Sequence, residues 1–216
     1  MKKIITIITV FILMTGMAMS QEKTTTYSSP KAYYTASWNT TFTLGDFNKW
    51  VSNTTPAGFD FGGRYFVTNG LAVGFNTGWQ RVGQAYGYQT LSIPSKGIAV
   101  TATNYRMTWM VPFQAAVDYH FLTSKVFSPY IGLGIGGDYM EHHLMVQEYD
   151  LYRTQWDFAL TPEIGALVRF GEYSNWGAQI GFNYKWTTNK IELYNDMKTD
   201  HLQMLNLKVG ISYIID

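Results

Sequence analysis

The sequence contains no cysteine, which excludes disulfide scaffolds, thiolate metal sites, cysteine nucleophiles and a lipid anchor on an amino-terminal cysteine. Charge is also scarce, because Asp, Glu, Lys and Arg make up 14% of the chain, against about 25% in typical soluble domains. The formal net charge is +1 with no long run of one sign, so the electrostatic footprint of a nucleic-acid-binding protein is missing. Aromatic residues, in contrast, reach 17%. Such a composition indicates a surface that largely meets something other than water.

The one long apolar run lies at the amino terminus. Lys2 and Lys3 precede an apolar core over residues 4–14, and Ala18-Met19-Ser20 places small residues at positions −3 and −1. This pattern is typical of a secretory signal peptide over residues 1–20, and it predicts cleavage between Ser20 and Gln21. No later stretch approaches the eighteen consecutive apolar residues of a transmembrane helix. A mature chain embedded in a membrane must therefore cross it with strands.

Residues 21–32 are rich in Thr, Ser and Pro and predict a flexible lead-in, whereas residues 33–216 predict one β domain. Polarity alternates there with period two in eight segments. In the first segment Tyr34, Ala36 and Trp38 share one face, while Ser37 and Asn39 share the other. Charged residues occur on the polar face of most segments and on the apolar face of none. Since Arg or Lys at mid-bilayer costs roughly 2–4 kcal/mol, the apolar faces are expected to meet hydrocarbon.

The connections between these segments alternate between long and short. The long connections are expected over residues 45–55, 83–104, 141–154 and 189–200, and Asn69-Gly70 predicts a tight hairpin turn at a short one. Long loops on one side and short turns on the other are typical of outer-membrane barrels. We therefore predict an all-β fold, an eight-stranded antiparallel up-and-down transmembrane β-barrel. The connection over residues 83–104 is the longest, and contact with a surface partner is expected there.

Aromatic residues near the segment ends are expected to form two girdles at the membrane interfaces. They are Tyr65, Trp79, Tyr119, Tyr139, Trp156, Phe170, Trp176, Trp186 and Tyr213.

Charged residues on the polar faces would point into a lumen only just wide enough for side chains. They are Asp60, Arg64, Asp118, Glu163, Arg169, Lys185 and Lys208. Two interpretations remain open, a paired and hydrogen-bonded plug or a narrow solute path lined by charge. Three acids against four bases favour the plug, because buried charges are tolerated only when they are paired.

Candidate chemistry is sparse. Glu141-His142-His143 suggests a metal site, but adjacent side chains in an extended segment point opposite ways, so a solvated loop without metal or cofactor is expected. A lipid hydrolase or acyltransferase needs a Ser–His–acid constellation, and neither His120 nor His201 lies in a motif of that kind. No catalytic or cofactor-binding residue is predicted, and the chain is expected not to be an enzyme.

Three stretches carry a resemblance to a known family: residues 62–74, residues 128–136 and the carboxyl-terminal residues 208–215. Over residues 33–215 the chain resembles the small eight-stranded outer-membrane barrels of the outer membrane protein A and X-like and opacity-type superfamily, in a Bacteroidetes style. The resemblance implies a Gram-negative outer-membrane protein surrounded by outer-membrane lipid, with a periplasmic lead-in. It also implies recognition by the barrel-assembly machinery through Lys208, Gly210, Tyr213 and Ile215.

The chain departs from that family in two respects. It ends in Ile215-Asp216, where the family more often ends on an aromatic residue. Pro112 and Pro162 also fall inside predicted strands, where each removes a ladder hydrogen bond. We expect local bulges or shifted strand boundaries at both prolines.

These motifs specify architecture better than activity, because the family includes adhesins, integrity proteins and a few lipid enzymes. A structural or surface-interaction role is expected. The alternatives are a narrow diffusion channel, a lipid-modifying enzyme and a soluble lipocalin-like ligand carrier with its apolar face inward. A polar face of Gly, Asn, Gln and Thr suits a barrel lumen better than a water-facing surface.

Overall fold

The computed structural model describes residues 30–93, 97–121, 126–191, 199 and 201–216. The predicted signal peptide, its cleavage site between Ser20 and Gln21, and nearly all of the lead-in lie outside the described residues. The first strand begins at Ala32, one residue before the predicted start of the barrel.

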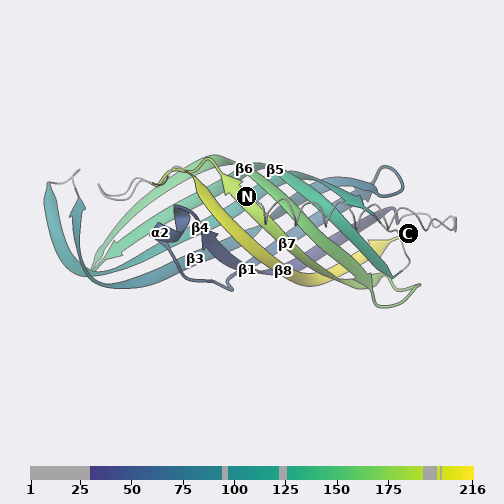
Figure 1. Ribbon diagram of the computed structural model, residues 1–216, viewed down its shortest axis with the longest axis horizontal. Coiled ribbons are helices and arrows are strands. Elements are labelled where there is room, and N and C mark those ends of the chain that lie inside the picture. The colour runs from purple at the N-terminus through teal and green to yellow at the C-terminus, as the bar shows by residue number, and fades with distance from the viewer. Residues whose placement is uncertain (1–29, 94–96, 122–125, 192–198, 200) are drawn as a thin grey trace, which may run out of the picture.

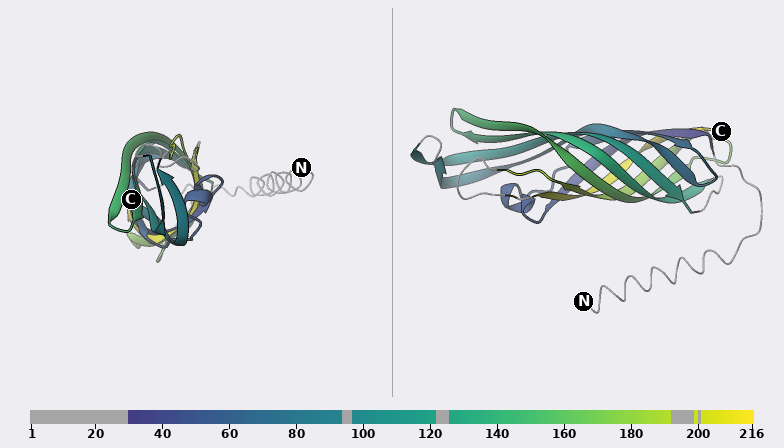
Figure 2. Two further views of the ribbon diagram at one scale, coloured as in Figure 1. Left: turned by 90° about the vertical axis from the view of Figure 1, so that its left-hand side faces the viewer. Right: turned by 90° about the horizontal axis from the view of Figure 1, so that it is seen from above.

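Eight strands form the fold, and each pairs antiparallel with its neighbours in the sequence. Their bounds are β1 Ala32–Leu44, β2 Gly58–Phe66, β3 Leu71–Ile93, β4 Ile98–His120, β5 Phe127–Val146, β6 Tyr149–Arg169, β7 Trp176–Thr187 and β8 Leu202–Ile215. β1 pairs with β8 from Ala32↔Ile215 to Leu44↔Gln203, which closes the sheet into a barrel (Figures 1 and 2). The predicted eight-stranded up-and-down barrel is confirmed.

The two ends of the barrel differ. The end where β1 begins and β8 ends, called the terminal end below, has tight connections such as residues 67–70 between β2 and β3. The opposite end carries the long extensions of β3 and β4 and the helix α2 (Phe47–Trp50), and it is called the hairpin end (Figure 1). No helix of the described residues is long and apolar enough to cross a membrane.

Side chains alternate between lumen and exterior as the sequence predicts. Trp38 and Ile180 face outward, with exposed fractions of 60% and 47%, whereas Asn39 and Gln179 face the lumen and are buried. Across the described strands, every side chain that faces outward between the aromatic girdles is uncharged. The apolar faces therefore lie outside the barrel, which is the reverse of a lipocalin-like carrier.

Two of the predicted long loops are wrong. Residues 83–104 are mostly strand, because β3 and β4 continue as a paired hairpin as far as Ile93↔Ile98. Residues 141–154 are likewise strand. The end of β5 pairs with the start of β6 from Val146↔Tyr149 to Glu141↔Thr154, and a two-residue turn at Gln147 and Glu148 joins them. Gln147 has a φ of 54°, as a tight hairpin turn requires. Both segments contain β-branched and aromatic residues, such as Thr90↔Thr101 and Val146↔Tyr149, that pair across the hairpin, so the length of the connections alone misidentifies them as loops.

The bulges expected at the two prolines are also absent from the described strands. The β4–β5 register is continuous across Pro112↔Asp138, and the β5–β6 register is continuous across Leu133↔Pro162. Pairing is interrupted only on the other side, towards β3 and towards β7, with the register kept. A proline lacks one donor that points to one neighbour only, so the ladder opens on that side without an inserted residue.

Candidate functional site

The lumen is filled by layers of paired polar side chains, and the first lies nearest the terminal end. Arg64 Nε donates to Asp118 Oδ2 at 2.7 Å, and both side chains are at most 6% exposed. Tyr33 OH donates to the same carboxylate oxygen at 2.7 Å. The Arg64 guanidinium also donates to Asn76 Oδ1 at 2.9 Å. The buried charge pair is thus surrounded by donors and acceptors, which is the condition for burying charge in a low-dielectric interior.

The second layer is centred on Lys208 of β8. Its Nζ lies 2.9 Å from Glu163 Oε2 and 3.6 Å from Asp60 Oδ2. Tyr130 OH donates to Glu163 Oε1 at 2.6 Å, and Gln179 Nε2 donates to Tyr130 OH at 2.6 Å. This layer therefore connects β2, β5, β6, β7 and β8 across the lumen.

A third layer crosses the barrel further towards the hairpin end. Lys185 Nζ lies 2.9 Å from Asp138 Oδ2, and the two side chains are 4% and 0% exposed. Lys185 also donates to Gln80 Oε1 at 3.2 Å, and Gln114 Nε2 donates to Asp138 Oδ1 at 3.1 Å. Strands β3, β4, β5 and β7 meet in this layer, and so the lumen is spanned by charge pairs at three levels.

The hairpin end of the lumen is closed by apolar packing. Phe47 and Trp50 of α2 are fully buried and pack into one cluster with Met110, Met140 and Met204. These side chains come from β4, β5 and β8, so the first connection folds inward over the lumen. We call this apolar closure the α2 plug.

The α2 plug is also held by polar contacts. Trp50 Nε1 donates to Thr108 Oγ1 at 3.0 Å, and Thr108 lies 2.8 Å from His142 Nδ1. Tyr86 OH donates to the Trp50 carbonyl at 3.0 Å, and the Arg106 guanidinium lies 5.6 Å from the Trp50 ring centroid. Trp50 is therefore anchored through its indole nitrogen, its ring face and its carbonyl.

The structure places the seven predicted lumen residues in two groups. Asp60, Arg64, Asp118, Glu163, Lys185 and Lys208 take part in the three layers. Arg169 instead lies at the terminal end, where its guanidinium pairs with Asp216, the last residue of the sequence. That contact lowers the pKa of the Asp216 carboxyl, chiefly because Arg169 donates hydrogen bonds to the carboxylate form.

Sequence reasoning missed several members of the site. Asp138 has a signal that could have found it, because it is a charged residue on the polar face of its alternating segment. Tyr33 and Tyr130 are harder to find, because lumen tyrosines in a chain with sixteen of them carry no distinguishing signal. Trp50 lies outside every alternating segment. Lys208, Gly210, Tyr213 and Ile215 all lie on β8, and their role as an assembly signal stays a prediction.

The adjacent histidines point opposite ways, as the sequence analysis expects. His142 is buried in the lumen, and its Nε2 lies 3.0 Å from Asn189 Oδ1. His143 faces outward, stacked against the rings of Trp109 and Tyr152, with Nδ1 2.8 Å from Asp150 Oδ2. The segment is therefore paired strand and not the solvated loop that was expected. Within the described ranges, no three His, Asp or Glu side chains gather in a metal-binding arrangement.

His120 is the histidine whose surroundings come nearest to a catalytic arrangement. Its Nδ1 lies 2.8 Å from Ser128 Oγ, and its Nε2 lies 3.4 Å from Tyr33 OH, which donates to Asp118. Rings of Tyr33, Phe66 and Tyr130 surround the imidazole. The pair lies at the terminal end and extends the first polar layer to the mouth of the lumen.

Comparisons with known proteins agree with this architecture. A model of the outer membrane protein beta-barrel domain matches residues 8–213. No curated protein sequence matches the chain. Similar solved structures include Ail, the attachment invasion locus protein of Yersinia pestis, in complex with the heparin analogue sucrose octasulfate. That structure has a TM-score of 0.49 and 11% identity over 87% of this chain and 99% of that one.

Two further solved structures are similar at the same level. Neisserial surface protein A has a TM-score of 0.48 and 16% identity, over 85% of this chain and 96% of that one. The outer membrane protease OmpT from Escherichia coli has a TM-score of 0.47 and 7% identity, over 90% and 100%. Because the family match covers nearly the whole chain and the strands close into the barrel it describes, this chain belongs to the outer membrane protein beta-barrel domain family and is a protein of the cell outer membrane.

Proposed function

We propose that this barrel has no open path through its lumen and acts at its outer surface, in a structural or surface-interaction role. In outer-membrane barrels the short turns face the periplasm and the long connections face outward. The terminal end is then periplasmic, and the hairpin end with the α2 plug is extracellular.

The observation that carries the proposal is the succession of closures along the lumen. An entering solute would meet the α2 plug, where Trp50 and Met110 are fully buried, and then the Lys185–Asp138 pair. Below these it would meet the layer of Lys208 and the layer of Arg64. Passage would require opening charge pairs whose members are nearly fully buried, and breaking one such pair costs about 3–5 kcal/mol.

The narrow-channel alternative makes the opposite prediction in planar bilayers. We expect the purified protein to give no stable step conductance under an applied voltage. A large water-filled porin measured in the same bilayers is the positive control, because its stable conductance steps would show that the assay detects an open lumen. Stable wild-type conductance that changes with Lys185→Met would overturn the proposal in favour of a channel.

The enzyme alternative is tested by measuring the masses of the outer-membrane lipids in cells that overexpress the protein. His143 and Asp150 form a pair on the outward face, near the interface where lipid headgroups lie, but the described residues bring no Ser nucleophile within hydrogen-bond reach of that imidazole. We expect outer-membrane lipid masses to be unchanged on overexpression. A new acylation state of the outer-membrane lipids that is lost in the His143→Gln or the His120→Gln variant would refute the structural role in favour of an enzymatic one.

A further inference from the structure

The extracellular hairpin of β3 and β4 presents a long unpaired strand edge. β2 pairs with β3 up to Gly58↔Gln80, and the Arg81 N–H donates to the Ala57 carbonyl at 2.9 Å. Over residues 82–93, β3 is paired with β4 alone among the described strands. At about 3.3 Å per residue, this edge is roughly 40 Å of strand, and it projects beyond the rest of the barrel (Figures 1 and 2).

The hairpin that carries this edge is packed and not a loose loop. Leu91 and Ala102, one from each strand, are 3% and 1% exposed. They belong to the same apolar cluster as Val146 at the end of β5, and Leu151 of β6 packs against it. The inner face of the hairpin is therefore covered. Ser52 and Trp50 contact the side chains of Gln84 and Tyr86 at the base of the edge, and beyond Tyr86 no backbone group of the described residues pairs with its free side.

The start of β6 forms a second unpaired strand edge at the hairpin end, and this edge differs from the β3 edge in its charge. Residues 149–157 of β6 extend beyond the β6–β7 pairing, which begins at Ala159↔Thr187. This β6 edge contains Asp150, Arg153 and Asp157, and charges of this kind are how proteins discourage strand addition. Residues 82–93 contain no charged residue and no proline. The β6 edge therefore carries charges that oppose strand addition, whereas the β3 edge over residues 82–93 carries none.

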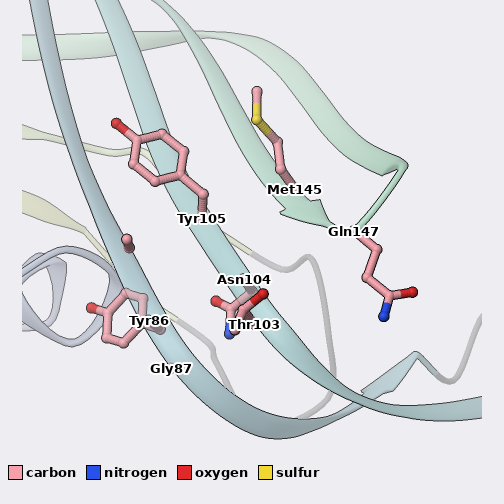
Figure 3. Close-up of a pocket in the computed structure, with 8 residues that line it drawn as sticks. Tyr86, Gly87, Thr103, Asn104, Tyr105, Met145 and Gln147 are labelled. Atoms are coloured by element: carbon pink, nitrogen blue, oxygen red, sulfur yellow. The ribbon is translucent and has the colours of Figure 1, made fainter.

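The β3 edge has a β-bulge near its middle, which bends the strand locally. Pairing shifts between Tyr86↔Asn104 and Gln89↔Ala102, so Gly87 and Tyr88 stand opposite the single residue Thr103. A cleft of about 520 Å³ opens beside this bulge, between the β3–β4 hairpin and the tip of β5 (Figure 3). Gly87 has open space around it, and the Tyr88 side chain is 81% exposed.

We propose that a second copy of this chain, in a facing membrane, pairs its residues 82–93 antiparallel with the same edge. The proposal rests on the proposed outer-surface role and names the partner for it. An uncharged strand can lie beside its own copy without like-charge repulsion, and Tyr and Thr give favourable cross-strand pairs. In an isologous contact both copies contribute the same surface patch, so residues 82–93 alone can form both sides of the interface.

The fixed orientation of the barrel in its membrane determines whether two paired copies lie in the same membrane or in two facing membranes. Copies in one membrane share the same orientation, so their β3 edges run parallel. Copies in facing membranes point towards each other, and their edges then run antiparallel. Antiparallel pairing is the more stable arrangement per residue and places the projecting hairpins side by side between the two surfaces. The facing arrangement is therefore favoured.

The experiment uses two populations of proteoliposomes with different dyes, each with the hairpin end outside. We expect wild-type vesicles to cluster, and we expect Tyr88→Lys or Gly87→Pro to reduce clustering at least tenfold. Thr154→Lys, which adds the same charge to the β6 edge, should leave clustering unchanged. The electrophoretic mobility of folded and heated protein monitors barrel folding in each variant.

Because the chain has no cysteine, single-cysteine variants at Ala85, Tyr88 and Thr90 locate the contact without background. We expect disulfide dimers between the two vesicle populations, strongest at one position, and none for Thr154→Cys. Absent clustering, clustering indifferent to Tyr88→Lys and Gly87→Pro, or cross-links only within one population would each overturn the inference. If the vesicles fail to cluster but remain impermeable to small solutes, the pairing inference is refuted and the closed lumen is not. If the vesicles leak, the proposed function itself is refuted.

Discussion

Replacing Lys208 with Met should destabilise the barrel more than any surface charge substitution. The side chain is 5% exposed and lies between the carboxylates of Glu163 and Asp60, at 2.9 and 3.6 Å. Met keeps the length of the side chain and its packing but leaves the buried Glu163 carboxylate and the partly buried Asp60 carboxylate without their cation. Breaking a buried pair in this way costs about 3–5 kcal/mol, a large share of a free energy of unfolding that is typically about 5–15 kcal/mol.

The assay is urea unfolding in lipid vesicles, followed by tryptophan fluorescence. Lys49→Met is the matched control, because the Lys49 side chain is 70% exposed and its pair with Asp46 is on the surface. We expect that control to lose at most about 1 kcal/mol. A second comparison uses Glu163→Gln in the Lys208→Met background, which removes one of the stranded charges and should restore about 1–3 kcal/mol. Equal losses for Lys208→Met and Lys49→Met, or strict additivity with Glu163→Gln, would refute the account of the lumen.

Three other substitutions test the lipid-facing side of β7, the close approach of the β2 and β3 backbones, and the ion pair at the terminal end. Ile180→Arg should lower the unfolding free energy by about 2–4 kcal/mol and reduce membrane assembly, while Ile180→Phe should be tolerated, as measured by the yield of folded protein. Gly74→Ala should be disruptive, because a Cβ there would overlap the backbone carbonyl oxygen of Gly63 in β2, whereas a Cβ at Gly87 would meet open space, so Gly87→Ala should be neutral in the same assay. Asp216→Asn should lower the unfolding midpoint slightly at pH 7. Since Arg169 lowers the folded-state pKa of Asp216, this difference is present above the unfolded pKa of about 3.9 and disappears as pH falls through the folded value.

Strand faces were the most predictable part of the fold. Hydrocarbon penalises charge on one face of every strand, so the period-two pattern in stretches such as residues 176–186 fixes which side faces out. Strand ends were less predictable, because nothing in the alternation of residues 83–104 tells a projecting hairpin from a loop. The prolines were misjudged for a related reason, since their effect depends on which neighbour the missing donor would have faced.

The candidate site was predictable in composition but not in pairing. The sequence places Lys185 and Lys208 on lumen faces, yet their partners come from strands far apart along the chain. Register and barrel closure decide that Asp138 meets Lys185 and that Glu163 meets Lys208. The α2 plug has no signal in the alternating pattern, because Trp50 enters the lumen from a connection and not from a strand.

The central claim is that the apolar faces meet lipid while the lumen is sealed from it, and fluorescence quenching by brominated lipids tests it most directly. Two single-tryptophan variants are compared in bilayers, one retaining Trp156, which is 62% exposed on the outward face, and one retaining the fully buried Trp50. We predict strong quenching of Trp156 and almost none of Trp50. Equal quenching of both, or quenching of Trp50 alone, would contradict the account.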